Sequence, residues 1–84
     1  MITSDSLKNI LILAGVENVQ KELDANYDYI YLELNIYNAG GSAFIKSMDY
    51  DEETDDEARE NGQLFCDKDD FRRLIKEATD LKFD

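Results

Sequence analysis

The stretch from Tyr29 to Tyr37, YIYLELNIY, alternates strictly between aliphatic and other side chains. A period of two is typical of a β-strand with one face buried. The expected buried face consists of Ile30, Leu32, Leu34 and Ile36, and the opposite face of Tyr29, Tyr31, Glu33, Asn35 and Tyr37. The sequence Asn38-Ala39-Gly40-Gly41 follows directly. It predicts a hairpin turn, because glycine adopts positive φ angles without steric cost.

Two further strands are expected after this turn. Residues 42–50 would return antiparallel, in a register that places Glu33 opposite Lys46. Asn61-Gly62 then predicts a second turn, and residues 63–66 a short third strand. We therefore expect a three-stranded antiparallel meander.

The N-terminal third carries two helical patterns. One apolar stripe at helical spacing consists of Leu7, Ile10, Leu11 and Ala14, and a second, on nearly the opposite face, of Ile12, Val16, Val19 and Leu23. Because one straight helix cannot bury both stripes against one sheet, we predict helices over about 4–14 and 16–25, broken at Gly15. A strand over residues 9–13 is the alternative interpretation.

A C-terminal helix is expected after Asp67, which is a good N-cap residue. Its apolar stripe consists of Phe71, Leu74, Ile75, Ala78 and Leu81. The 84 residues are enough for one domain. The predicted fold class is thus α+β: one domain over residues 1–84, with an N-terminal helix broken near Gly15, a three-stranded antiparallel sheet and a C-terminal helix packed on the sheet.

The charge of the chain is concentrated in residues 49–60, DYDEETDDEARE. Eight acids and one base give this stretch a net charge of −7, out of −11 for the whole chain. The acids are Asp49, Asp51, Glu52, Glu53, Asp55, Asp56, Glu57 and Glu60. We expect the stretch to form a loop between the second and third strands. Its charge disfavours binding to nucleic acid or to an anionic membrane, and it favours a basic partner.

The sequence offers little for catalysis. It has no histidine, which removes the commonest general base and most zinc sites. Cys66 is the only cysteine, and it is either a small core residue or a thiol with a lowered pKa next to a helix N-terminus. We expect a monomeric protein that is not an enzyme and that uses no cofactor or metal. A lone cysteine and the absence of a secretion signal favour the cytoplasm.

Three interpretations of the acidic stretch remain open. The first is a solvated loop. The second is a calcium-binding loop, because acids stand at EF-hand positions 1, 3, 5, 7, 9 and 12, although Thr54 replaces the required glycine. The third is mimicry of nucleic acid, in which carboxylates pair with the Lys and Arg side chains that normally bind phosphates.

Aromatic residues and a second acidic group would support a binding surface. Apolar anchors on the sheet face opposite the aliphatic stripe are expected from Tyr29, Tyr31, Tyr37, Phe44, Met48 and Tyr50. The alternative is that the N-terminal helices cover these residues as a second core. Secondary contacts with a partner are expected from Asp67, Asp69 and Asp70.

In size, acidity and element order, the chain resembles small inhibitors encoded by phages and mobile elements. These include anti-restriction proteins, the uracil-DNA glycosylase inhibitor and, most similar, type II anti-CRISPR proteins. Tyr50-Asp51-Glu52 with Thr54-Asp55 is similar to an acidic loop of the glycosylase inhibitor. The resemblance implies a DNA mimic that occupies the groove of a CRISPR effector nuclease. The competing hypothesis is an acidic interaction module, such as an immunity protein or antitoxin, that binds through its tyrosine-rich sheet face.

Overall fold

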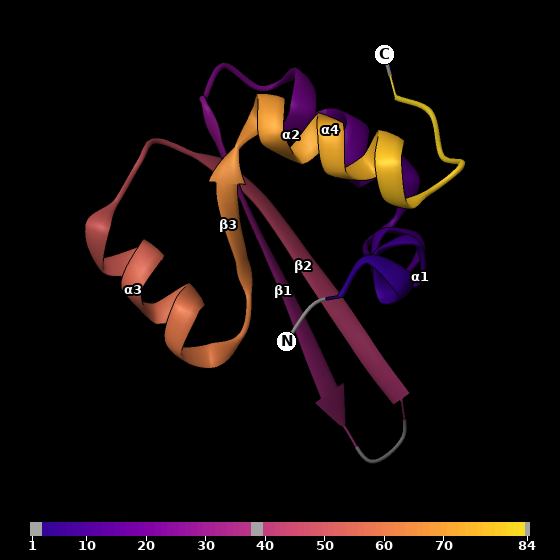
Figure 1. Cartoon of the computed structure of the whole chain (residues 1–84), viewed down its shortest axis with the longest axis horizontal. Helices are drawn as coiled ribbons and strands as arrows, with labels where there is room; N and C mark the ends of the chain where they lie inside the picture. Colours follow the sequence, from indigo (N-terminus) through magenta and orange to yellow (C-terminus); the bar gives the residue numbers. More distant parts are fainter. Residues whose placement is uncertain (1–2, 38–39, 84) are drawn as a thin grey trace.

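The computed structural model describes residues 3–37 and 40–83. The fold is α+β, as predicted, and its elements in chain order are α1 (Ser4–Ala14), α2 (Val16–Asp24), β1 (Tyr29–Tyr37), β2 (Gly40–Met48), α3 (Glu52–Asn61), β3 (Leu64–Asp67) and α4 (Lys68–Ala78). Figure 1 shows α1, α2 and α4 gathered on one side of the strands and α3 alone on the other. Among the described helices, none is both long and apolar enough to cross a bilayer.

The predicted break at Gly15 is confirmed. Gly15 has a φ of 97° and separates α1 from α2. Two features disfavour any residue other than glycine at this position. The positive φ is unfavourable for residues with a side chain, and a Cβ atom would lie 3.1 Å from the side-chain nitrogen of Asn18. That nitrogen donates a hydrogen bond to the carbonyl of Ala14 and so helps to end α1.

The meander was wrong, because the strand order is β2-β1-β3 and β1 lies in the centre. The predicted register was wrong by two residues, since Glu33 pairs with Phe44 and Tyr37 with Gly40. A shift of two residues leaves every side chain on its predicted face. The last pair of the hairpin is therefore Tyr37 with Gly40 instead of Asn38 with Gly41, and residues 38–39 lie outside the described residues.

The acidic stretch forms a helix, not the loop that we expected. Charge repulsion within α3 is offset by caps at both ends. The Asp51 carboxylate accepts hydrogen bonds from the backbone N–H and the hydroxyl of Thr54, at 3.1 and 2.6 Å. At the other end Gly62 adopts the left-handed conformation, with a φ of 72°, and Gln63 N donates to the carbonyl of Ala58. The acidic first turn also suits the positive end of the helix dipole.

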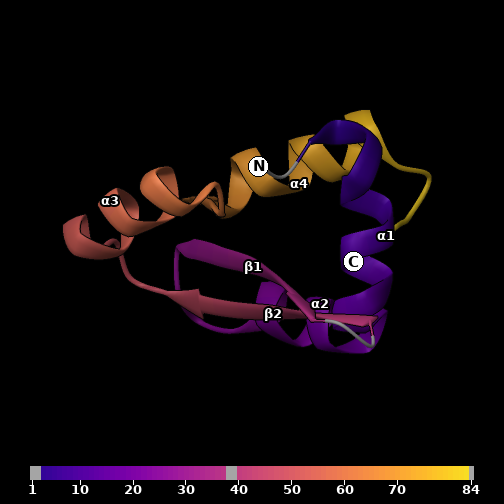
Figure 2. The same cartoon turned by 90° about the horizontal axis from the view of Figure 1, so that it is seen from below.

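The core lies on the predicted aliphatic face of the sheet. Its fully buried side chains include Leu11, Val19, Ile30, Leu32 and Phe71. They come from α1, α2, β1 and α4, and Figure 2 shows α4 above the strands with α1 standing across their end. Of the second N-terminal stripe, only Val19 and Leu23 are buried, whereas Ile12 and Val16 are 51% and 41% exposed.

Side-chain hydrogen bonds join separate elements of the fold at positions that the apolar periodicity does not indicate. The Glu22 carboxylate of α2 accepts hydrogen bonds from the backbone N–H and the hydroxyl of Ser47 in β2. The side-chain oxygen of Gln63, the residue just before β3, accepts from the backbone N–H of Leu34 in β1 at 3.0 Å. The Lys68 ammonium of α4 donates to the carbonyls of Leu23 and Ala25 at the end of α2.

Candidate functional site

The acidic residues of α3 lie mostly in solvent. Along the helix, Glu52, Glu53, Asp56, Glu57 and Glu60 are exposed, and Asp49 is exposed just before it. Residues four apart lie on one face of a helix, so Glu52, Asp56 and Glu60 form one acidic row. The structure thus brings most of the predicted acidic residues onto one rigid element.

Two of the predicted acids serve the helix itself. Asp51 is its N-cap, as described above. The carboxylate of Asp55 is only 18% exposed, because the Arg59 guanidinium lies 3.2 Å from it and the Tyr50 hydroxyl donates a hydrogen bond to it over 3.4 Å. Desolvation and then the charges of Asp55 and Glu52 raise the pKa of Tyr50. The Tyr50 hydroxyl therefore stays protonated and links the acidic helix to the aromatic side chains beside it.

An aromatic cluster of Tyr29, Tyr50 and Phe65 lies at the base of α3. Its ring centroids are 5.3 Å apart for Tyr29 and Tyr50, 5.2 Å for Tyr29 and Phe65, and 6.0 Å for Tyr50 and Phe65. Sequence reasoning missed Phe65, because the meander placed β3 beside β2, whereas Phe65 pairs with Tyr31 of β1. With the strand order β2-β1-β3, Phe65 would have been expected beside Tyr29 and Tyr31.

The rest of this sheet face is open in part. Tyr31 packs against Phe44 with ring centroids 6.4 Å apart, and Phe44 is 49% exposed. Burial and then the charge of Glu33 raise the pKa of Tyr31, with a further contribution from Glu57 of α3. The N-terminal helices cover the aliphatic face and not this one. The predicted Tyr37 side chain lies outside the described residues.

The second acidic group does not join α3. Asp67 caps α4 by accepting a 2.8 Å hydrogen bond from the backbone N–H of Asp70, and Asp70 forms a 3.0 Å ion pair with Arg73. Asp67 is the last residue of β3, so this group lies at the end of the strand that is farther from α3, about 10 Å along it from Leu64. Of Asp67, Asp69 and Asp70, two therefore have local structural roles.

The helical form of residues 52–61 contradicts the calcium-loop hypothesis. An EF-hand loop folds around the ion so that its ligands converge, whereas a helix spreads successive carboxylates around its axis. No group of three or more acidic or cysteine side chains able to hold a metal is found in the described part of the chain.

Cys66 is part of the packing and not an activated thiol. Its side chain packs against the core from β3. Burial, followed by the charges of Asp67 and Asp70, raises the pKa of Cys66 to about 12. The thiolate needed for nucleophilic attack is thus disfavoured, and the core interpretation is supported.

This pKa predicts slow alkylation of the folded protein. At pH 8 we expect iodoacetamide to react with native Cys66 at least about a hundredfold more slowly than with the chain unfolded in guanidinium, where the thiol pKa returns to about 8.5. Mass spectrometry over time measures both rates. Comparable rates in the two states would show that the thiol is accessible and ionised in the fold.

Comparisons of the chain with protein-family models, with curated proteins and with solved structures found no match.

Proposed function

We propose that the protein is a nucleic-acid-mimicking inhibitor that binds the basic DNA- or RNA-binding groove of a host defence nuclease, in the manner of an anti-CRISPR protein. It would act in the host cell cytoplasm. The observation that carries the proposal is α3, a helix capped at both ends. It presents a row of carboxylates next to the aromatic cluster of Tyr29, Tyr50 and Phe65.

The charge density of α3 approaches that of DNA. Between Glu52 and Glu60 lie six acids and one base, Arg59, for a net charge of −5. At a rise of 1.5 Å per residue this segment is about 12 Å long, or one net charge per roughly 2.4 Å. Duplex DNA carries one charge per about 1.7 Å of axis. A groove lined with Lys and Arg side chains would therefore meet a similar field.

The aromatic cluster supplies what charge alone lacks. Solvent-exposed ion pairs contribute little affinity, so a specific complex needs anchors that become desolvated. Tyr50 is 54% exposed and touches the acidic helix through Asp55. The Tyr50 ring can enter a pocket of the partner while the carboxylates of α3 pair with the partner's Lys and Arg side chains.

A competition experiment with charge-reversed variants tests the proposal. The variant Asp56→Lys/Glu57→Lys/Glu60→Lys avoids the residues that cap or brace α3. We expect the wild-type protein to displace a fluorescent target duplex from a guide-loaded type II CRISPR nuclease, and the variant to do so at least tenfold more weakly. Fluorescence anisotropy measures the displacement, and affinity should fall steeply as salt rises.

The control moves the same charge to other elements. Glu17→Lys/Asp24→Lys/Glu77→Lys changes exposed residues of α2 and α4, and three changes of +2 each take both variants from −11 to −5. Mimicry by α3 predicts that only the α3 variant loses inhibition. Equal losses of duplex displacement in both variants would show that inhibition depends only on net charge. If the wild-type protein displaced no duplex, the proposal would be contradicted for this class of nuclease.

The exposure of Phe44 and Tyr50 favours a second candidate, an interaction module of the immunity-protein or antitoxin type. Its contacts would centre on the aromatic sheet face. Here the Phe44→Ala/Tyr50→Ala variant would lose partner binding, while reversal of Asp56, Glu57 and Glu60 would leave it within about threefold. Affinities of both variants for the same captured partner distinguish the two functions.

A further inference from the structure

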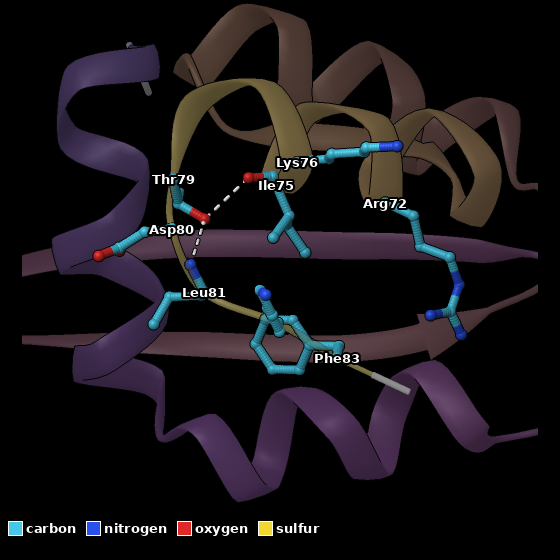
Figure 3. A pocket seen from close by; sticks show the side chains of 8 residues that line it. Arg72, Ile75, Lys76, Thr79, Asp80, Leu81 and Phe83 are labelled. Atoms are coloured by element: carbon cyan, nitrogen blue, oxygen red, sulfur yellow. Dashed lines mark hydrogen bonds between the residues drawn. The ribbon is translucent and has the colours of Figure 1, made fainter.

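A cavity with basic and apolar walls lies at the opposite end of the molecule from α3. It has a volume of about 450 Å³ and opens between α4 and residues 79–83. Figure 3 shows Ile75 pointing from α4 toward the ring of Phe83, with Leu81 beside them. These three side chains give the cavity an apolar floor. Cavities of about 300–1,000 Å³ with such walls are the usual size of small-molecule sites.

The wall made by residues 79–83 is held in place by specific contacts. The Thr79 hydroxyl donates to the carbonyl of Ile75 at 2.8 Å and accepts from the backbone N–H of Leu81 at 3.1 Å. The Lys8 ammonium of α1 lies 2.6 Å from the Asp80 carboxylate. The hydrogen bond and charge of Lys8 lower the pKa of Asp80, so this ion pair persists at neutral pH. The cavity is therefore largely formed before any ligand arrives.

The charge around the cavity is opposite to that of the protein. Arg72, Lys76 and Lys82 line it, which is three of the nine bases in a chain of net charge −11. Within residues 3–37 and 40–83, Asp80 is the only acid that lines the cavity, and Figure 3 shows its side chain directed away from the hollow. The rim thus attracts a single negative charge, while the acidic remainder of the molecule repels large polyanions.

We propose that this cavity binds a small amphipathic anion, a medium-length hydrocarbon chain with one carboxylate or similar head. The chain would lie on Ile75, Leu81 and Phe83, where burial of apolar surface is favourable. The head would lie at Lys76 and Lys82 on the rim. This site is independent of the function proposed for α3.

Decanoate below its micelle concentration is the probe for this site. We expect saturable one-to-one binding by calorimetry, with amide chemical-shift changes centred on residues 72–83. Decylammonium has the same chain and the opposite charge, and we expect it to bind at least fivefold more weakly. This comparison uses the unmodified protein, so it does not depend on the folding of a variant.

Matched variants locate the head group. Lys76→Gln/Lys82→Gln should weaken decanoate binding at least fivefold, whereas Lys21→Gln/Lys46→Gln, two exposed residues of α2 and β2, should leave it unchanged. Equal binding of decanoate and decylammonium, shifts outside residues 72–83, or no saturation would overturn the proposal. Sedimentation with phosphatidylglycerol vesicles distinguishes a free acid from a membrane lipid as the ligand. Binding to vesicles without binding to decanoate would show that the ligand is a membrane surface.

Discussion

Phe71→Ala is expected to lower the free energy of unfolding by about 3–5 kcal/mol, because it leaves a cavity at the centre of the core. Phe71 has no exposed surface and joins α4 to the residues of α1, α2 and β1. A domain of this size has a total stability near the lower end of about 5–15 kcal/mol. The melting temperature should therefore fall by at least about 12 °C. Thermal unfolding followed by circular dichroism measures it.

Phe44→Ala is the matched control, since it removes the same ring from the other face of the sheet. Phe44 is 49% exposed and packs only on Tyr31 among the ring contacts described. We expect a loss of no more than about 1 kcal/mol, the energy of one aromatic pair. Similar losses for Phe44 and Phe71 would contradict the placement of the core on the aliphatic face.

Lys68→Met is expected to destabilise the protein by about 1–2 kcal/mol. Lys68 begins α4, where a positive charge is unfavourable to the helix dipole by about 0.3–1 kcal/mol. Its half-buried ammonium nevertheless donates to the carbonyls of Leu23 and Ala25, which end α2. Hydrogen bonds from a charged group contribute about 1.5–3 kcal/mol, so their loss outweighs the relief at the dipole. Urea unfolding measures the difference.

Lys21→Met removes an equal charge from an exposed position in α2. We expect it to change the free energy of unfolding by no more than about 0.5 kcal/mol. If Lys68→Met were as stable as Lys21→Met, the ammonium would not be the link between α4 and the end of α2. Retention of the alkyl stem in Met keeps the packing of the side chain and isolates the charged group.

The acidic segment shows where prediction from sequence stopped. Residues 49–60 have the charge of a loop, and eight like charges argue against a helix. The caps at Asp51 and Gly62 were visible in the sequence as residue types. Their effect depends on Ala58, which is 2% exposed and is the one buried residue of α3. A single alanine in an acidic run gives too weak an apolar pattern to indicate that contact.

The candidate site was found in part. The exposed acids of α3 and the residues Tyr29 and Tyr50 were predicted, whereas Phe65 and the brace from Arg59 to Asp55 were not. The cavity beside α4 was missed as well. Its apolar floor includes Leu81 and Phe83, which both lie beyond the end of α4 at Ala78. The sequence pattern placed Leu81 on the apolar stripe of the C-terminal helix, so the helical pattern did not indicate this floor.

The sequence by itself determined the class of fold, the break at Gly15, the strand Tyr29–Tyr37 and the face of that strand that is buried. These features depend on local backbone preference and on the period of apolar residues, which are properties of neighbouring positions. Only the tertiary structure decided that β1 lies in the centre, that Phe65 meets Tyr29 and that α3 forms. Those outcomes depend on which distant surfaces bury each other, and residues such as Ala58 contribute to them through contacts that their neighbours in the chain do not indicate.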